Sequence, residues 1–142
     1  MPRDSLADQV WRQMSALVID NKDGWRRAVV EQTGLPFSRI RILKRLARRP
    51  MTVKEIAEAA TIDAPAATVA VNDLEQRGYV VRRVDPDNRR CKLVSLTDEG
   101  REAVATINAV DDPPPDALAA LSDDDLELLR SVLGRLAAAA RR

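Results

Sequence analysis

The sequence predicts a mainly helical protein with one small β-hairpin, an α+β fold built around a single core. Apolar residues recur every three to four positions over most of the chain, which is the spacing of amphipathic helices. Two short segments rich in valine and leucine enclose the turn-forming run 85–92, which predicts the hairpin. The composition, with 45 % apolar, 32 % charged and 3 % aromatic residues, is typical of a helix-rich folded protein. A chain of 142 residues is long enough for one core, and two full domains would be cramped.

The first 35 residues are expected to be helical. Apolar residues at helical spacing predict an amphipathic helix over residues 5–19. The polar run 20–24 ends in a glycine and breaks or kinks this helix, and residues 25–32 are helical again. Gly34 and Pro36 then fit a stop and a fresh start. The apolar stripe of the first helix is Leu6, Val10, Met14, Leu17 and Val18.

Three helices are expected between Pro36 and Gly78. Thr52 and Glu55 form a capping box, in which each side chain satisfies a free N–H at the start of the second helix. Asp63 caps the third helix, and the glycine at position 78 stops it. The expected core residues are Ile40, Leu43, Leu46 and Ala47 on the first helix, Ile56 and Ala59 on the second, and Ala67, Ala70, Val71 and Leu74 on the third.

The run 85–92 has the chemistry of a turn between two strands. Its proline presets φ, and its aspartate and asparagine side chains can bond to their own backbone. Residues 80–84 and 93–96 therefore form the arms of a β-hairpin. The tip of this hairpin places Arg89 and Arg90 where two long cations leave the body of the protein.

Two further helices are expected after the hairpin. Thr97 caps the first of them, and the acidic residues that follow lie where the helix dipole favours them. The run 111–115 ends this helix, because its prolines lack an N–H and clash with the preceding turn. Ser122 caps the last helix. The apolar faces are Val104, Ile107 and Val110 on the first helix, and Leu126, Leu129, Val132, Leu133 and Leu136 on the last.

The short helix that begins at Thr52 and the helix over residues 63–77, followed by the hairpin, have the form of a winged helix-turn-helix that reads DNA. Residues 36–92 carry 13 Arg/Lys against 7 Asp/Glu, whereas residues 93–142 carry 5 against 10. Such charge blocks are often only solvated faces. The basic excess coincides with the helix-turn-helix and the wing, which favours a polyanionic partner.

Four short motifs occur in a characteristic order and spacing. Residues 87–89 read Asp-Asn-Arg in the hairpin, and residues 96–101 read Leu-Thr-Asp-Glu-Gly-Arg at the start of the next helix. Residues 73–78 read Asp-Leu-Glu-Gln-Arg-Gly, and residues 121–126 read Leu-Ser-Asp-Asp-Asp-Leu. Together these motifs make residues 34–136 resemble the MarR family of transcriptional regulators.

The resemblance implies a winged helix-turn-helix region, residues 36–96, intertwined in one structural domain with helical dimerisation regions, residues 1–35 and 97–142. It implies a homodimer that binds a pseudo-palindromic operator in double-stranded DNA and is released by a small aromatic or phenolic effector, and we expect this binding to make it a repressor. The composition, rich in arginine and alanine, indicates a bacterial source, and the single cysteine and the lack of a membrane span predict the cytoplasm. The terminal helices support the dimer, since each has an apolar stripe that must be buried. A monomer that folds both helices back on its core is the alternative.

The helix over residues 63–77 is expected to enter the major groove. Thr68 and Asn72 can hydrogen-bond to base edges or phosphates, or they are ordinary surface residues. No cation precedes Arg77 in this helix, in contrast to the family pattern, so sequence choice is expected to depend also on the wing and on DNA shape. The groove-facing candidates are Pro65, Ala66, Thr68, Val69 and Asn72.

The resemblance places Arg89 at the wing tip, inserted into the minor groove, with Asp87 buttressing its guanidinium and Arg90 beside it. Narrow minor grooves have an enhanced negative potential that attracts arginine. The alternative is a solvated turn, whose exposed Asp–Arg contact would contribute about 0–1 kcal/mol. The expected phosphate contacts are Lys54, Arg77, Arg82, Arg83 and Lys92.

The resemblance implies that an effector pocket lies between the winged core and the dimerisation helices. The large aromatic residues are scarce, and Trp11, Trp25 and Phe37 are the candidates for its lining, with core packing as the alternative role of each. The lone cysteine, Cys91, is expected to be a small hydrophobic residue or a redox switch.

Other functional classes have less support. The chain has no histidine, no glycine-rich phosphate loop, no cluster of metal ligands and no nucleophile motif, so neither catalysis nor a metal or cofactor is expected. No apolar run approaches the roughly 18 residues of a membrane span. The rival function is that of a winged-helix protein with weak or non-specific DNA binding that serves as a protein–protein interaction module. The apolar and acidic recognition helix favours this rival.

Overall fold

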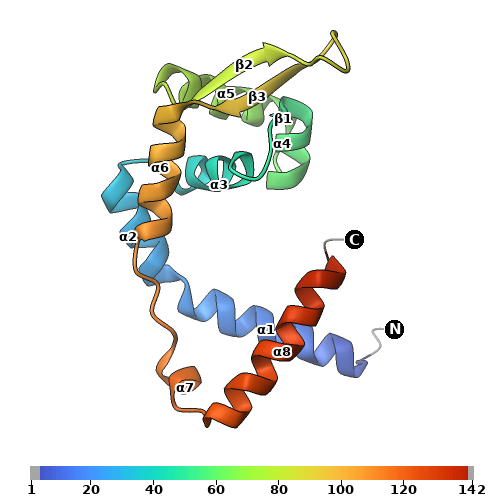
Figure 1. The fold of residues 1–142 in the computed structure, drawn as a ribbon, viewed down its shortest axis with the longest axis vertical. Coiled ribbons are helices and arrows are strands. Elements are labelled where there is room, and N and C mark those ends of the chain that lie inside the picture. The colour runs from blue at the N-terminus through green and yellow to red at the C-terminus, as the bar shows by residue number, and fades with distance from the viewer. Residues whose placement is uncertain (1–3, 141–142) are drawn as a thin grey trace. The chain divides into compact units, whose positions relative to one another are not determined.

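The computed structural model describes residues 4–140, which divide at residues 111 and 112 into two compact units (Figure 1). The first unit begins with helices α1 (Leu6–Asn21), α2 (Asp23–Thr33) and α3 (Phe37–Leu46). The second unit holds α7 (Asp116–Ala119) and α8 (Asp123–Ala140).

A helix-turn-helix and a small sheet complete the first unit. The two-residue strand β1 (Met51–Thr52) leads into α4 (Val53–Ala60) and α5 (Ala64–Gln76). The hairpin β2 (Val80–Val84) and β3 (Lys92–Leu96) follows, and then α6 (Asp98–Ala109).

The sheet is antiparallel and has the strand order β1-β3-β2. Val80 pairs with Leu96, and Val84 pairs with Lys92, while Met51 pairs with Val94 on the other side of β3. The turn between β2 and β3 extends beyond the helices of its own unit (Figure 1). The expected mainly helical fold with a hairpin wing is therefore confirmed, and β1 is an edge strand that the sequence pattern did not predict.

One core joins α2, α3, α4, α5, α6 and the sheet. The expected stripes of α5 and α6 are buried in it. Ala47 was expected in the core and is exposed, because α3 ends at Leu46 and Ala47 lies beyond its last turn, whereas Ile42 is buried instead. The largest fully buried side chains are Leu35, Ile40, Ile42, Leu43, Ile56, Leu74, Ile107, Val29, Val71 and Val94.

The expected helix ends are confirmed by their hydrogen bonds. The Thr52 hydroxyl accepts from the Glu55 N–H at 3.1 Å, and a Glu55 carboxylate oxygen accepts from the Thr52 N–H at 3.1 Å. Asp63 accepts from the Ala66 N–H at 2.7 Å. Gly78 has a φ of +83°, a left-handed conformation that glycine adopts without steric cost. The chain therefore leaves α5 sharply and enters β2 two residues later.

The apolar stripes of α1 and α8 are not covered within their own units. No described residue of α1 or α8 is buried. Leu6 and Val18 of the α1 stripe, and Leu136 of the α8 stripe, each expose more than half of their surface. Since water disfavours such stripes, both helices need a partner surface. None of the helices between residues 4 and 140 is both long enough and apolar enough to span a membrane.

Candidate nucleic-acid interface

Helix α5 divides into a buried side and an exposed side. Ala67, Ala70, Val71 and Leu74 pack into the core. The five residues expected to face the groove are all exposed, and Val69 exposes 60 % of its surface. The helix therefore has the orientation that the expected major-groove contact needs, although its free side is mostly apolar. These five residues are Pro65, Ala66, Thr68, Val69 and Asn72.

Asp73 ties α5 to α3. Its carboxylate accepts from Arg39 Nε at 2.9 Å and from Arg77 Nε at 3.1 Å. The hydrogen bond from Arg39 is the main cause that lowers the pKa of Asp73, with the hydrogen bond and charge of Arg77 adding to it. Asp73 therefore stabilises the angle between the two helices, and Arg77, expected at a phosphate, is held at the end of α5.

Replacing this carboxylate should make the stability of the fold less dependent on pH. A lowered pKa in the folded state means that ionised Asp73 stabilises the fold above its unfolded pKa of about 3.9 and loses that contribution as pH falls through the folded value. We expect Asp73→Asn to be less stable than the parent at neutral pH, and the difference to shrink below about pH 4. Urea unfolding at a series of pH values measures it, and Arg39→Met should behave similarly. A difference that stays constant with pH would contradict the charge-based role.

The wing turn is closed by its own backbone. The Asp85 N–H donates to the Cys91 carbonyl at 3.0 Å, and the Cys91 N–H donates to the Asn88 carbonyl at 2.9 Å. Arg89 and Arg90 are exposed at this turn. Their side chains have no hydrogen bond or ion pair with any residue between 4 and 140. Two cations are therefore available to an external anion.

The expected ion pair between Asp87 and Arg89 is not formed in this structure. The Asp87 N–H donates to Asp85 Oδ1 at 2.9 Å, so Asp85 organises the turn instead. Sequence spacing could not separate these two aspartates, since both lie within reach of the same turn.

The base of the wing is joined to α5 and α6 by Thr97. Its hydroxyl donates to the Gly78 carbonyl at 2.5 Å, and its N–H donates to the Tyr79 carbonyl at 3.0 Å. The same hydroxyl accepts from the Gly100 N–H at 3.0 Å, which caps α6. Through its hydroxyl and its backbone N–H, this one residue thus joins the end of α5, the root of β2 and the start of α6. Of these roles, the sequence pattern predicted the cap alone.

Adjacent arginines on β2 have different surroundings. The Arg82 side chain is 22 % exposed and lies against α5, where it donates to Asn72 Oδ1 and lies 3.6 Å from the Glu75 carboxylate. Arg83 is exposed, as are Lys54 at the start of α4 and Lys92 at the start of β3. The expected phosphate contacts remain predictions, and the placement of Arg82 favours a different role.

Of the three aromatic residues expected to line an effector pocket, Trp25 and Phe37 are in contact with each other and Trp11 is not. The rings of Trp25 and Phe37 contact edge to face, with centroids 5.9 Å apart. Lys44 lies 5.0 Å from the Trp25 ring, and Arg26 lies 4.5 Å from the Phe37 ring. Both rings pack partly against the core, which matches their alternative role. Trp11 is 67 % exposed and borders a separate hollow on the surface of α1.

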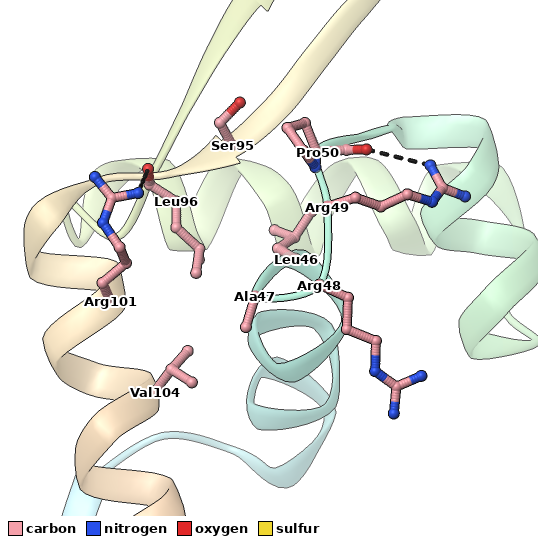
Figure 2. A pocket seen from close by; sticks show the side chains of 9 residues that line it. All are labelled: Leu46, Ala47, Arg48, Arg49, Pro50, Ser95, Leu96, Arg101 and Val104. Carbon is pink, nitrogen blue, oxygen red and sulfur yellow. Dashed lines mark hydrogen bonds between the residues drawn. The ribbon is translucent and has the colours of Figure 1, made fainter. Parts of the chain in front are cut away.

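A pocket of about 280 Å³ lies between the end of α3, β3 and α6 (Figure 2). Leu46, Leu96 and Val104 contribute its apolar part. Two of its cations are already engaged, because Arg101 donates to Asp98 at 2.7 Å and Arg49 lies 2.9 Å from the Glu55 carboxylate. The third cation of its lining, Arg48, has no side-chain partner between residues 4 and 140, so the pocket combines an apolar part with one unpaired charge.

Comparisons with known proteins agree on one family. Residues 33–90 match the model of the MarR family. The chain is 32 % identical to the HTH-type transcriptional regulator YdgJ of Bacillus subtilis (strain 168), over 73 % of the chain and 65 % of YdgJ. It is 30 % identical to a putative transcriptional regulatory protein for the hcr operon of Thauera aromatica, over 78 % of the chain and 68 % of that protein.

The chain spans less than two thirds of the length of YdgJ and 58 % of YcgE, a further Bacillus subtilis regulator. Among solved structures, the apo form of wild-type MarR from E. coli superposes with a TM-score of 0.71 at 19 % identity, over 95 % of the chain and 98 % of MarR. At that identity the superposition shows the fold alone.

Proposed function

The chain belongs to the MarR family of transcriptional regulators, and we propose that it binds a specific sequence of double-stranded DNA as a homodimer. In this proposal α5 lies in the major groove and the β2–β3 turn reaches the adjacent minor groove. The family and the relatives are regulators and not enzymes. Binding to the chromosome would place its action in the cytoplasm.

The observation that carries the proposal is the pair of free cations at the wing turn. Arg89 and Arg90 are exposed and have no side-chain partner between residues 4 and 140. Long cations on a closed turn are suited to the negative potential of a narrow minor groove. Thr97 bonds the root of the wing to the end of α5, so both parts can meet one duplex together.

A homodimer is proposed because the apolar faces of α1 and α8 are not buried. The stripes of α1 and α8 are exposed within their own units, and a second copy of the chain offers the same stripes in return. Two copies of α5 related by a twofold axis would then read a pseudo-palindromic operator. If this operator overlaps a promoter and bound protein blocks RNA polymerase, the protein acts as a repressor.

Release by a small aromatic or phenolic effector is a further part of the proposal. Its support is the contact between Trp25 and Phe37, with Lys44 and Arg26 against their rings. A planar anion could stack on such rings and neutralise these cations.

The alternative function is a protein–protein interaction module with weak or non-specific DNA binding. The observation that favours it is the apolar exposed side of α5, where Val69 is 60 % exposed. This module would bind random and selected duplexes equally well.

Selection from a random duplex library, followed by fluorescence anisotropy, tests the proposal. We expect one enriched pseudo-palindromic sequence, bound at least about a thousandfold more tightly than random DNA. If about four phosphates per subunit are neutralised, log K should fall with log salt concentration with a slope of roughly −7 for the dimer. Library DNA that shows no enrichment after selection would support the interaction module instead. Analytical ultracentrifugation of the free protein tests the dimer separately.

A further inference from the structure

The side chain of Asn72 on α5 contacts an arginine of the wing. It lies on the exposed side of the helix, about one turn after Thr68. Its Oδ1 atom accepts a hydrogen bond from Nη2 of Arg82, which comes from β2. Helix α5 packs beside β2 in the first unit (Figure 1). The contact therefore joins a candidate base-reading residue to the strand that leads to the wing.

The chemistry of this contact fixes which way the amide faces. A guanidinium group has only donors, so it is the oxygen and not the nitrogen of Asn72 that must face Arg82. The other end of the amide, Nδ2, has no partner among residues 4–140. An asparagine that is free to rotate can offer either end to a base, whereas this one is left with its donor end.

Arg82 is itself held in place on the α5 side of the sheet. Its Nη2 atom lies 3.6 Å from a Glu75 carboxylate oxygen, and its Nε atom is buried without a hydrogen-bond partner. A buried N–H without a partner is unfavourable, so the contacts at Nη2 must offset its cost. The neighbouring Arg83 is exposed and makes no such contact. An arginine that waits in solvent for a phosphate would be as exposed as Arg83, whereas the Arg82 side chain is only 22 % exposed.

We propose that Arg82 is a positioning residue that turns the amide donor of Asn72 toward the major groove, so that Asn72 selects a base with an acceptor edge. Such edges are N7 or O6 of guanine, N7 of adenine and O4 of thymine, whereas the major-groove edge of cytosine presents a donor. Asn72 therefore excludes cytosine at one position of each half-site. This inference rests on the proposed function, since it needs α5 to lie in the major groove.

The test compares base preferences of purified variants by selection and by titration of duplexes changed one base pair at a time. In the parent protein, cytosine at the contacted position should lower affinity by about 5- to 30-fold. Asn72→Ala should abolish this preference at that position alone. Arg82→Met, which keeps the aliphatic length but has no donor, should weaken the same preference. The double variant Asn72→Ala/Arg82→Met should have the same base preference as Asn72→Ala alone, because Arg82 acts through Asn72.

Arg83→Met is the matched control, since it removes the same charge from the next residue of the same strand. It should lower affinity for all duplexes alike and reduce the salt slope by about one unit per subunit. If Arg82→Met instead behaves as this control does, Arg82 is a phosphate contact and the inference is overturned. Unchanged base preference in Asn72→Ala, whose exposed position should leave folding intact, overturns it as well. A parent protein that selects no sequence overturns the proposed function and the inference together.

Discussion

Arg89→Ala should lower the affinity for the selected operator by roughly 30-fold or more in a dimer, because each specific arginine contact contributes about 1–3 kcal/mol. The side chain is exposed and has no partner between residues 4 and 140, so its removal takes nothing from the fold. The melting temperature and the dimer should therefore stay unchanged. Titration by fluorescence anisotropy, with thermal unfolding of both proteins, measures both quantities.

Two control variants separate the position of Arg89 from its charge. Arg27→Ala removes one exposed cation from α2 and should change affinity little. Arg89→Lys keeps the charge but loses the planar group of arginine, and it should recover only part of the affinity. Operator binding by Arg89→Ala that matches the parent would exclude the proposed minor-groove contact.

Gly100→Ala should destabilise the fold by about 1–3 kcal/mol, which overpacking in a well-packed interior typically costs. A Cβ atom at this buried position would lie 2.1 Å from the Tyr79 carbonyl oxygen and 3.2 Å from a methyl carbon of Leu96. The oxygen belongs to the backbone and accepts the hydrogen bond of the Thr97 N–H, so it cannot rotate away as a side chain could. The start of α6 must move instead, and the base of the wing must move with it.

Thermal and urea unfolding measure this loss, and Gly134→Ala provides the matched control. Gly134 lies in α8, and apart from the backbone of its own helix no described atom lies within 4 Å of the methyl carbon that alanine would add. It is on the opposite side of the helix from Leu129 and Leu136. Its replacement should stabilise the helix by about 0.5–1 kcal/mol, since alanine loses less backbone entropy than glycine. Equal stability of Gly100→Ala and the parent would show that α6 adjusts at no cost.

Arg89→Ala and Gly100→Ala change the two opposite ends of the hairpin. Arg89 is at its free end, and Gly100 lies where its base meets α6. If operator binding requires a fixed position of the wing relative to α5, Gly100→Ala should weaken binding even at temperatures where the variant remains folded.

The order of the residues alone did not predict the strand β1 or the short helix α7. The other helices, several of their ends and the hairpin could be predicted from it. These features depend on contacts between residues that are near in the chain, such as the Thr52–Glu55 capping box, or on periodic burial along one helix. Thr97 caps α6 for a reason that is equally local, since its hydroxyl accepts from the Gly100 N–H three residues later. The exposed cations at the wing turn followed in the same way, since a turn must project from the strands that it joins.

The contacts between side chains of different helices and strands could not be predicted from the sequence and are known only from the folded structure. Strand alternation places Arg82 and Arg83 on opposite faces, but it does not say which face meets α5. Asp73 reaches Arg39, which is 34 residues away, and Gly100 lies against the carbonyl of Tyr79. These contacts depend on how helices and sheet pack in space, and many residues far apart in the chain set that packing together. For this reason the sequence predicted that α5 and the wing contact DNA, whereas only the folded structure revealed that Arg82 of β2 holds the side chain of Asn72 on α5.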